Sequence, residues 1–270
     1  KKIWVFGAWY GQKYADNSKY LYEYIQENEK GIKAVWITKN RQLFNNLRKQ
    51  RKTVFLSNSL LGIWYCLRAK YVFLTSNQND VNSYCINGAK QVWLWHGMPL
   101  KKIIYCDDVY KEIPIWKKII VNCINPYIKV KPYYTLTSSD FFTPFLMKAF
   151  KLPEKRILKT GLPRCDAFFS GQTDSYIKTI KSNYPNAKVF LYMPTFRMSS
   201  NRNGSAFSPF INEFGFEDKK FAIFLDQQDI VFLFKPHFVD NEVTVTINSP
   251  RFKFLRDEDF DDLYILLNIN

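Results

Sequence analysis

The 270-residue sequence has few of the residues that mark common cofactor sites: five cysteines, ten glycines and only two histidines. The cysteines are widely spaced and include no C-x-x-C pair, so neither a disulfide framework nor a zinc site is predicted, and a reducing, cytoplasmic environment is favoured. The glycines form neither a G-x-G-x-x-G nor a Walker A pattern. This absence argues against ordinary dehydrogenases and P-loop ATPases.

Long hydrophobic runs and carboxylate clusters are also missing. The most apolar window, residues 54–74, is interrupted by Asn58, Arg68 and Lys70, so no segment is predicted to span a bilayer. The start of the chain lacks the architecture of a signal peptide. The carboxylates show no metal-ligand spacing, and adjacent Asp-Asp pairs are interpreted as surface residues. No metal and no cofactor is therefore predicted.

Basic residues, by contrast, are abundant. The chain has 39 Lys and Arg against 24 Asp and Glu, a net charge of +15 that favours nucleic acid, phosphorylated small molecules or an acidic membrane surface as partners. With 47% hydrophobic and 18% aromatic residues, the chain has enough apolar surface for folded cores. Its length favours two domains.

Short apolar runs alternate with amphipathic stretches, which predicts strands joined by crossover helices in a parallel sheet. The expected strands of the first part are residues 3–6, 34–37, 53–56, 71–74, 91–95 and 134–137, and the expected helices are residues 17–29, 43–49, 60–69 and 139–150. Asn17 and Ser18 are expected to cap the first helix, and Ser139 with Asp140 to open the last one.

A second series of elements follows: strands at residues 189–192, 230–234 and 252–255, and helices at 218–225 and 263–267. A doubly wound domain has about five or six strands, so this second domain is expected to be incomplete in the sequence. The prediction is an α/β protein with Rossmann-like domains at residues 1–165 and 166–270.

The two histidines each follow a predicted apolar strand, His96 after residues 92–95 and His237 after residues 230–234. In open α/β sheets ligands bind beyond the carboxyl ends of the strands, which predicts that both imidazoles lie where a substrate binds. A single strand-end histidine is more often structural. The equivalent placement of both favours a functional role.

Several neighbours of these histidines are suited to phosphate. Gly97 permits a close backbone approach to a ligand, and Lys101 and Lys235 carry charge near each histidine. Arg164 and Arg197 follow proline turns and can bind phosphate through paired hydrogen bonds. The alternative is that both are solvated arginines after proline-terminated strands.

The ordered segments WHGMPLKKI, SSDFFTPFLMKAF, KRILKTGLPRCDAFF, LYMPTFR and FLFKPHF resemble the CDP-glycerol glycerophosphotransferases, which build the polyol-phosphate chains of teichoic acids and related capsules. The resemblance covers about the whole chain. It implies a GT-B architecture of two Rossmann-like domains facing a cleft, with the acceptor side in the first domain and the nucleotide side in the second, truncated one. It also implies His96 as general base, His237 as a contact of the donor pyrophosphate, and Arg164 and Arg197 as phosphate-facing residues.

The implied reaction moves a polyol phosphate, with glycerol phosphate favoured over ribitol phosphate or another unit, from a CDP-polyol donor to a hydroxyl of a lipid-linked or growing polyol-phosphate acceptor, releasing CMP. The implied location is cytoplasmic and peripheral, on the anionic inner face of the cell membrane. The family's TDYSS-like segment, expected soon after residues 263–267, is absent, so this chain alone is expected to lack part of the nucleotide site and its activity.

Two other functions remain open from the sequence. A GT-B glycosyltransferase that uses a nucleotide sugar would share the fold and the basic strand ends. A nucleic-acid-binding module would use the positive charge and the aromatic residues, but these aromatics have core spacing and do not alternate with Lys and Arg. No nucleic-acid partner is therefore expected, while the polyol and the oligomeric state stay open.

Overall fold

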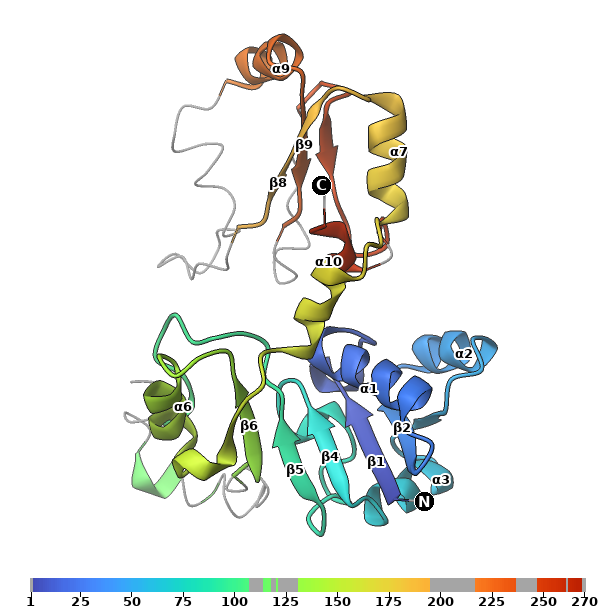
Figure 1. Cartoon of the computed structure of the whole chain (residues 1–270), viewed down its shortest axis with the longest axis vertical. Coiled ribbons are helices and arrows are strands. Elements are labelled where there is room, and N and C mark those ends of the chain that lie inside the picture. The colour runs from blue at the N-terminus through green and yellow to red at the C-terminus, as the bar shows by residue number, and fades with distance from the viewer. Residues whose placement is uncertain are drawn as a thin grey trace. The chain divides into compact units, whose positions relative to one another are not determined.

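The computed structural model describes residues 2–106, 114–117, 120, 131–194, 217–236, 247–260 and 262–268 (Figure 1). The chain divides into two compact units, Lys1–Asp166 and Ala167–Asn270. The boundary expected from the sequence, after residue 165, lies one residue earlier. Among the described residues, no helix has the length and apolar character that crossing a membrane requires.

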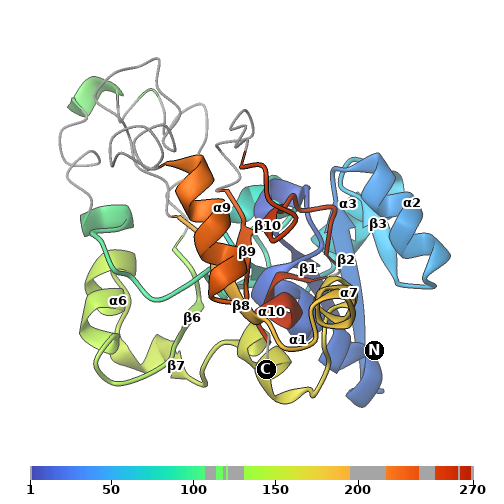
Figure 2. The same ribbon diagram turned by 90° about the horizontal axis from the view of Figure 1, so that it is seen from above.

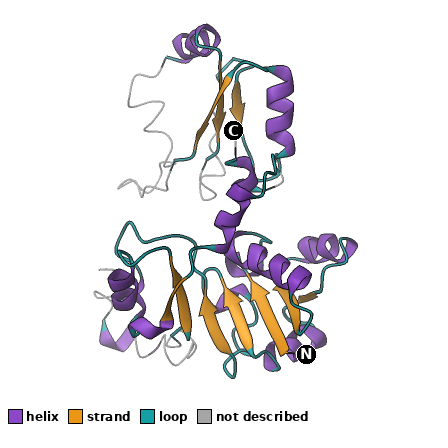
Figure 3. Cartoon of the chain, in the orientation of Figure 1, coloured by secondary structure: helices purple, strands orange, loops and turns teal. Residues whose placement is uncertain are grey.

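Within its described residues, the first unit contains a seven-stranded sheet with the order β3-β2-β1-β4-β5-β6-β7, in which every neighbouring pair is parallel. Its strands are β1 (Lys2–Gly7), β2 (Ile32–Thr38), β3 (Val54–Leu56), β4 (Tyr71–Leu74), β5 (Lys90–Trp93), β6 (Tyr134–Thr137) and β7 (Ile157–Lys159). Its helices are α1 (Asp16–Asn28), α2 (Arg41–Lys49), α3 (Leu60–Leu67) and α6 (Thr143–Phe150), with short 3-10 turns η1 (Trp9–Gly11), η2 (Gln78–Asp80), η3 (Ile104–Cys106), η5 (Glu154–Arg156) and η6 (Pro163–Phe169). The α/β class predicted from the sequence is confirmed (Figure 3).

Helices cover both faces of this sheet, and the strands are apolar on both sides as a buried parallel sheet requires. In β1, Val5 belongs to one buried cluster and its neighbour Phe6 to the other. The Val5 cluster includes residues of α3 and α6, whereas the Phe6 cluster includes residues of α1 and α2. In Figure 2, α2 and α3 lie beside β3. The sheet edge where the strands end is thereby held rigidly between two cores.

Two helices begin elsewhere than the sequence predicts. The N-cap of α1 is Ala15, which makes no side-chain cap bond, so Asn17 and Ser18 are not caps but buried residues of the first turn. The α6 helix begins at Thr143, after the expected Ser139 and Asp140, and its N-cap also lacks a side-chain bond. Apolar residues recur at helical spacing along 141–150, but Phe141 and Phe145 are exposed, while Leu146, Ala149 and Phe150 are buried.

Gly7, at the carboxyl end of β1, is packed against the backbone of η2. A Cβ atom built on Gly7 would lie 2.4 Å from the carbonyl oxygen of Asp80 and 2.5 Å from Cγ1 of Val81. Because the backbone of η2 would have to move, Gly7→Ala is expected to lower the free energy of unfolding by about 1–3 kcal/mol. Urea denaturation measures the effect. Gly31→Ala, where a Cβ meets no atom within 4 Å, is the control, and equal loss in both variants would contradict this account.

The second unit contains a parallel three-stranded sheet with the order β10-β9-β8 within the described residues. Its elements are α7 (Ser175–Asn183), β8 (Lys188–Tyr192), α9 (Asp218–Gln227), β9 (Ile230–Phe234), β10 (Phe252–Phe254) and α10 (Leu263–Leu266). Ile177 and Ile180 of α7 pack with Val231 and Leu233 of β9 in its core. The three strands match the sequence prediction, which missed α7 in this unit and β7 in the first.

Candidate active site

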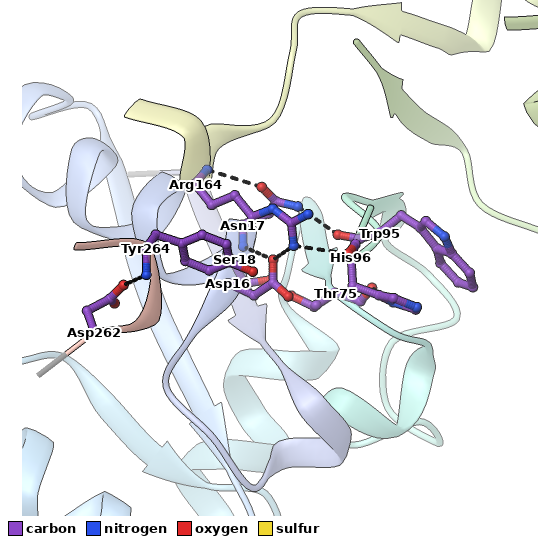
Figure 4. Close-up of polar contacts among 9 residues, drawn as sticks. All are labelled: Asp16, Asn17, Ser18, Thr75, Trp95, His96, Arg164, Asp262 and Tyr264. Atoms are coloured by element: carbon purple, nitrogen blue, oxygen red, sulfur yellow. Dashed lines mark hydrogen bonds and ion pairs between the residues drawn. The ribbon is translucent and has the colours of Figure 1, made fainter. Parts of the chain in front are cut away.

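The loops that follow β1, β4 and β5 converge because these three strands are neighbours in the sheet and run parallel. The β5 strand ends at Trp93, and the chain continues through Leu94 and Trp95 to His96. Figure 4 shows His96 beside Thr75, which follows β4. This is the edge of an α/β sheet at which ligands bind.

The imidazole of His96 has a defined orientation. Its Nδ1 lies 3.4 Å from the carbonyl oxygen of Thr75. Because a carbonyl oxygen can only accept a hydrogen bond, this contact requires the proton on Nδ1 and leaves Nε2 with the lone pair. The ring stacks on the indole of Trp95 at 4.3 Å between centroids and lies 5.5 Å from that of Trp9. The nitrogen with the lone pair is the one that can accept a proton from a substrate.

Thr75 is itself firmly held. The carboxylate of Asp80 accepts hydrogen bonds from the backbone N–H groups of Thr75 at 2.8 Å, Ser76 at 2.6 Å and Tyr10 at 2.7 Å. Burial raises the pKa of Asp80 to about 6, and these N–H donors act in the opposite direction. The fixed loop presents the Thr75 carbonyl to His96.

The electrostatics of the site favour a neutral His96. Burial lowers the pKa of the imidazole below its ordinary value, the Thr75 carbonyl and the Asp16 carboxylate act to raise it, and the Arg164 guanidinium lowers it. The net direction is downward. At neutral pH the ring is therefore in its basic form, as a general base requires.

Arg164 lies against the backbone of the His96 loop. Its Nη1 donates to Oδ1 of Asp16 at 3.0 Å and to the carbonyl oxygen of His96 at 3.0 Å (Figure 4). A Cβ built on Gly97 would lie 3.6 Å from Nη2 of Arg164. The structure thus brings together three residues singled out in the sequence. The alternative interpretation of Arg164 as a solvated arginine is wrong, since its side chain is only 16% exposed and ion-paired.

The sequence family model of the CDP-glycerol:poly(glycerophosphate) glycerophosphotransferases matches residues 1–269. The chain belongs to this family. The family predicted from the ordered sequence segments is confirmed.

Among curated relatives, the teichoic acid glycerol-phosphate transferase of Staphylococcus aureus (strain NCTC 8325 / PS 47) is 25% identical over 98% of this chain and 67% of its own length. The ribitol-phosphate polymerase TarL of the same strain is 31% identical over 75% of this chain and 35% of its own length. The poly(glycerol phosphate) polymerase of Bacillus subtilis (strain 168) is 26% identical over 73% of this chain and 26% of its own length. The chain thus spans from about a quarter to two thirds of these relatives.

Among solved structures, the wall teichoic acid polymerase TagF matches with a TM-score of 0.71 and 20% identity, covering 100% of this chain and 64% of that chain. A likeness of this extent shows a shared fold. The GT-B-like fold class expected for the glycerophosphotransferase family, with two Rossmann-like units, is confirmed.

The other predicted site residues of this glycerophosphotransferase family member are either seen in separate segments or not described. Lys101 is exposed on the loop that follows Gly97. Lys235, in the second unit, directly follows β9, is 9% exposed, and donates to Oδ1 of Asp257 at 2.7 Å. Arg197 and His237 lie outside the described residues. No group of three or more His, Cys, Asp or Glu side chains among the described positions is arranged to hold a metal ion.

Three buried polar residues at the start of α1 were not among the predicted site residues. Asn17 donates through Nδ2 to the carbonyl oxygen of Trp95 at 2.7 Å, and its Oδ1 accepts from the backbone N–H of Arg164 at 3.1 Å. The hydroxyl of Ser18 lies 2.8 Å from that of Thr75. Asp16 pairs with Arg164. Their position after the first strand was the available signal, since that loop opens at the same sheet edge as His96.

Proposed function

We propose that this protein transfers a polyol phosphate, specifically glycerol phosphate, from a CDP-polyol to a hydroxyl of a lipid-linked or growing polyol-phosphate acceptor, in teichoic acid or capsule synthesis. The observation that carries the proposal is a neutral His96 with its Nε2 lone pair at the ligand-binding edge of the sheet, in a member of the glycerophosphotransferase family. Relatives that act with glycerol phosphate and ribitol phosphate support the substrate class. A TagF variant soaked with CDPG supports a CDP-linked donor.

In the proposed reaction the acceptor hydroxyl oxygen attacks the phosphorus atom that carries the polyol. A new oxygen–phosphorus bond forms, the bond from that phosphorus to the bridging oxygen breaks, and CMP leaves with the electron pair. Nε2 of His96 takes the hydroxyl proton. Catalysis of this kind depends on alignment and on neutralising charge over the phosphate oxygens.

We assign the charge-neutralising role to the other predicted residues. Lys101, Lys235, Arg197 and His237 are proposed to contact the donor phosphates, and Gly97 to let the backbone approach them. Residues 1–165 are proposed as the acceptor side and residues 166–270 as the nucleotide side. Arg164 is ion-paired to Asp16, so its contribution at the phosphate is proposed to be a long-range positive charge.

Donor titration tests the proposal. Calorimetric titration of the full-length protein with CDP-glycerol, CDP-ribitol and UDP-glucose is expected to give binding by the CDP-polyols, with CDP-glycerol the tighter of the two. UDP-glucose is the matched nucleotide-sugar control. Binding of UDP-glucose with no binding of either CDP-polyol would replace the proposal with a sugar transferase.

We further propose a peripheral location on the anionic inner face of the cell membrane. The outer side of α3 exposes Leu60, Leu61, Trp64 and Leu67, with Leu60 88% exposed. Exposed Arg68 follows this helix directly. Apolar side chains beside a cation suit an acidic lipid surface, where each nearby Lys or Arg stabilises binding by about 1 kcal/mol.

The double variant Leu60→Ser/Trp64→Ser is expected to lower binding to phosphatidylglycerol-containing vesicles at least about tenfold, since each apolar side chain that leaves water contributes about 1.5 kcal/mol. Vesicle co-sedimentation measures it. Phe224→Ser on α9, where the side chain is 47% exposed against 48% for Trp64, is the control and should change nothing. Unchanged binding by the double variant would remove α3 from the membrane contact.

A further inference from the structure

The loop that carries His96 has an unusual backbone on both sides of the histidine. Trp95 has a φ of 59° and Gly97 a φ of 153°. A non-glycine residue in the left-handed region costs on the order of 1 kcal/mol, and such a conformation persists only where surrounding contacts impose it. The contacts that impose it here come from two distant parts of the chain.

Those contacts bind two consecutive carbonyl groups. The carbonyl oxygen of Trp95 accepts from Nδ2 of Asn17 at 2.7 Å, and that of His96 accepts from Nη1 of Arg164 at 3.0 Å. The two donors are also joined, because Oδ1 of Asn17 accepts from the backbone N–H of Arg164 at 3.1 Å. Asp16 completes the cluster by pairing with Nη1 of Arg164 at 3.0 Å. We call Asp16, Asn17 and Arg164 the loop clasp.

The clasp is fixed from within the first unit. Asp16 is 1% exposed and Asn17 is 0% exposed, and both begin the 13-residue helix α1, which packs into the sheet core. Asp16 also has a left-handed φ of 64°, and its Oδ1 accepts from the backbone N–H of Asn17 at 2.8 Å. A buried amide with one donor and one acceptor bond to two different loops is a rigid connection, because breaking it leaves buried polar atoms without partners.

We propose that Asn17 is a positioning residue, which holds the backbone of the His96 loop so that Nε2 of His96 faces the acceptor hydroxyl. This inference rests on the proposed function for its chemistry. Arg164 holds the adjacent carbonyl, so the loop is fixed on both residues that precede Gly97. Displacing a catalytic base by about 1 Å lowers the reaction rate on the order of a hundredfold, so the position of this loop is important for catalysis.

The surroundings of His96 make its pKa a second measurement that tests the clasp. The charged groups that face the ring are Asp16 on α1 and Arg164 on η6, and its other neighbours are the Thr75 carbonyl and the indoles of Trp9 and Trp95. Release of the loop from Asn17 lets the ring leave the Trp95 indole and become hydrated. Since burial is what lowers the pKa of His96, its pKa then rises toward that of a free imidazole.

The test compares Asn17→Ala with Asn82→Ala. Asn82 has the same bonding pattern as Asn17, donating to the carbonyl oxygen of Ser57 at 3.0 Å and accepting from the N–H of Tyr84 at 3.3 Å, but makes no hydrogen bond to the His96 loop in the described structure. Asn17→Ala is expected to lower kcat about a hundredfold, with the KM for CDP-glycerol changed less than about threefold. Asn82→Ala is expected to retain the parent kcat.

The pKa of His96 can be measured independently of turnover. The sequence has only two histidines, so imidazole NMR signals titrated with pH are assigned by comparison with His237→Ala. The His96 pKa should rise in Asn17→Ala and stay at the parent value in Asn82→Ala. An unchanged His96 pKa together with an unchanged kcat in Asn17→Ala would overturn the proposal.

Failure of the proposed function is distinguishable from failure of the clasp. If the parent does not turn over a CDP-polyol but the His96 pKa rises in Asn17→Ala, the result supports the clasp and contradicts the proposed function. If Asn17→Ala does not fold, Asn17→Leu carries the same titration, because leucine has a similar volume but can neither donate to the Trp95 carbonyl nor accept from the Arg164 N–H. A parent-like His96 pKa in folded Asn17→Leu would then contradict the clasp.

Discussion

Replacing His96 with alanine is expected to lower kcat for polyol-phosphate transfer by about 10²- to 10⁴-fold, the usual contribution of a positioned general base. The affinity for CDP-glycerol should change little, because the histidine is assigned to the acceptor hydroxyl. Its Nε2 is the ring atom with the lone pair, since Nδ1 donates to the Thr75 carbonyl. Steady-state kinetics and donor titration of the same variant separate the two quantities.

The pH dependence of the parent should follow the same histidine. A base acts in its neutral form, and burial lowers the pKa of His96, so kcat/KM should stay high below the ordinary imidazole pKa of about 6.5 and fall as the pH drops through the lowered value. The acid limb should disappear in His96→Ala. Near-parent turnover by that variant would contradict the assignment of His96 as the general base.

Replacing Arg164 with methionine is expected to lower the free energy of unfolding by about 3–5 kcal/mol, the range found when one partner of a buried ion pair is removed. The side chains of Arg164 and Asp16 are 16% and 2% exposed, so the variant leaves an unpaired carboxylate in the interior. The double variant Asp16→Asn/Arg164→Met should recover part of this loss, because no charge then remains buried. Urea denaturation of the three proteins measures both effects.

The control for this variant is an exposed ion pair. Lys220 and Glu217 pair at 2.7 Å with side chains 76% and 61% exposed. Lys220→Met should therefore change the free energy of unfolding by no more than about 1 kcal/mol. A loss of similar size in Lys220→Met and Arg164→Met would show that burial of the Asp16–Arg164 pair has no special energetic importance.

The position of His96 was predictable because strand periodicity locates the end of β5, and the carboxyl edge of a parallel sheet is where ligands bind. The residues that contact the His96 loop were not predictable in this way. Asp16 begins α1, after β1, and Arg164 lies on η6, after β7, 148 residues away in the sequence, so no local pattern shows that they meet. Local pattern shows which loops share an edge but not which side chains meet.

The errors at helix starts have a related cause. Asn and Ser often cap helices, yet the side chains of Asn17 and Ser18 form hydrogen bonds to Trp95 and Thr75 in other loops. Tertiary contacts therefore override the local preference. Phe141 has the spacing of an apolar helix face with Phe145, yet it precedes α6 and is 70% exposed. The β7 strand is three residues long and leaves too short a pattern to detect.

CMP release from CDP-glycerol in the presence of a polyol-phosphate acceptor measures the proposed transfer most directly. The full-length protein is expected to form CMP and extended acceptor in equal amounts, to use CDP-ribitol more slowly, and to leave UDP-glucose intact, with His96→Ala reducing the rate at least about a hundredfold. Consumption of UDP-glucose with release of UDP, while both CDP-polyols remain unchanged, would contradict the assignment of polyol-phosphate transfer to this protein.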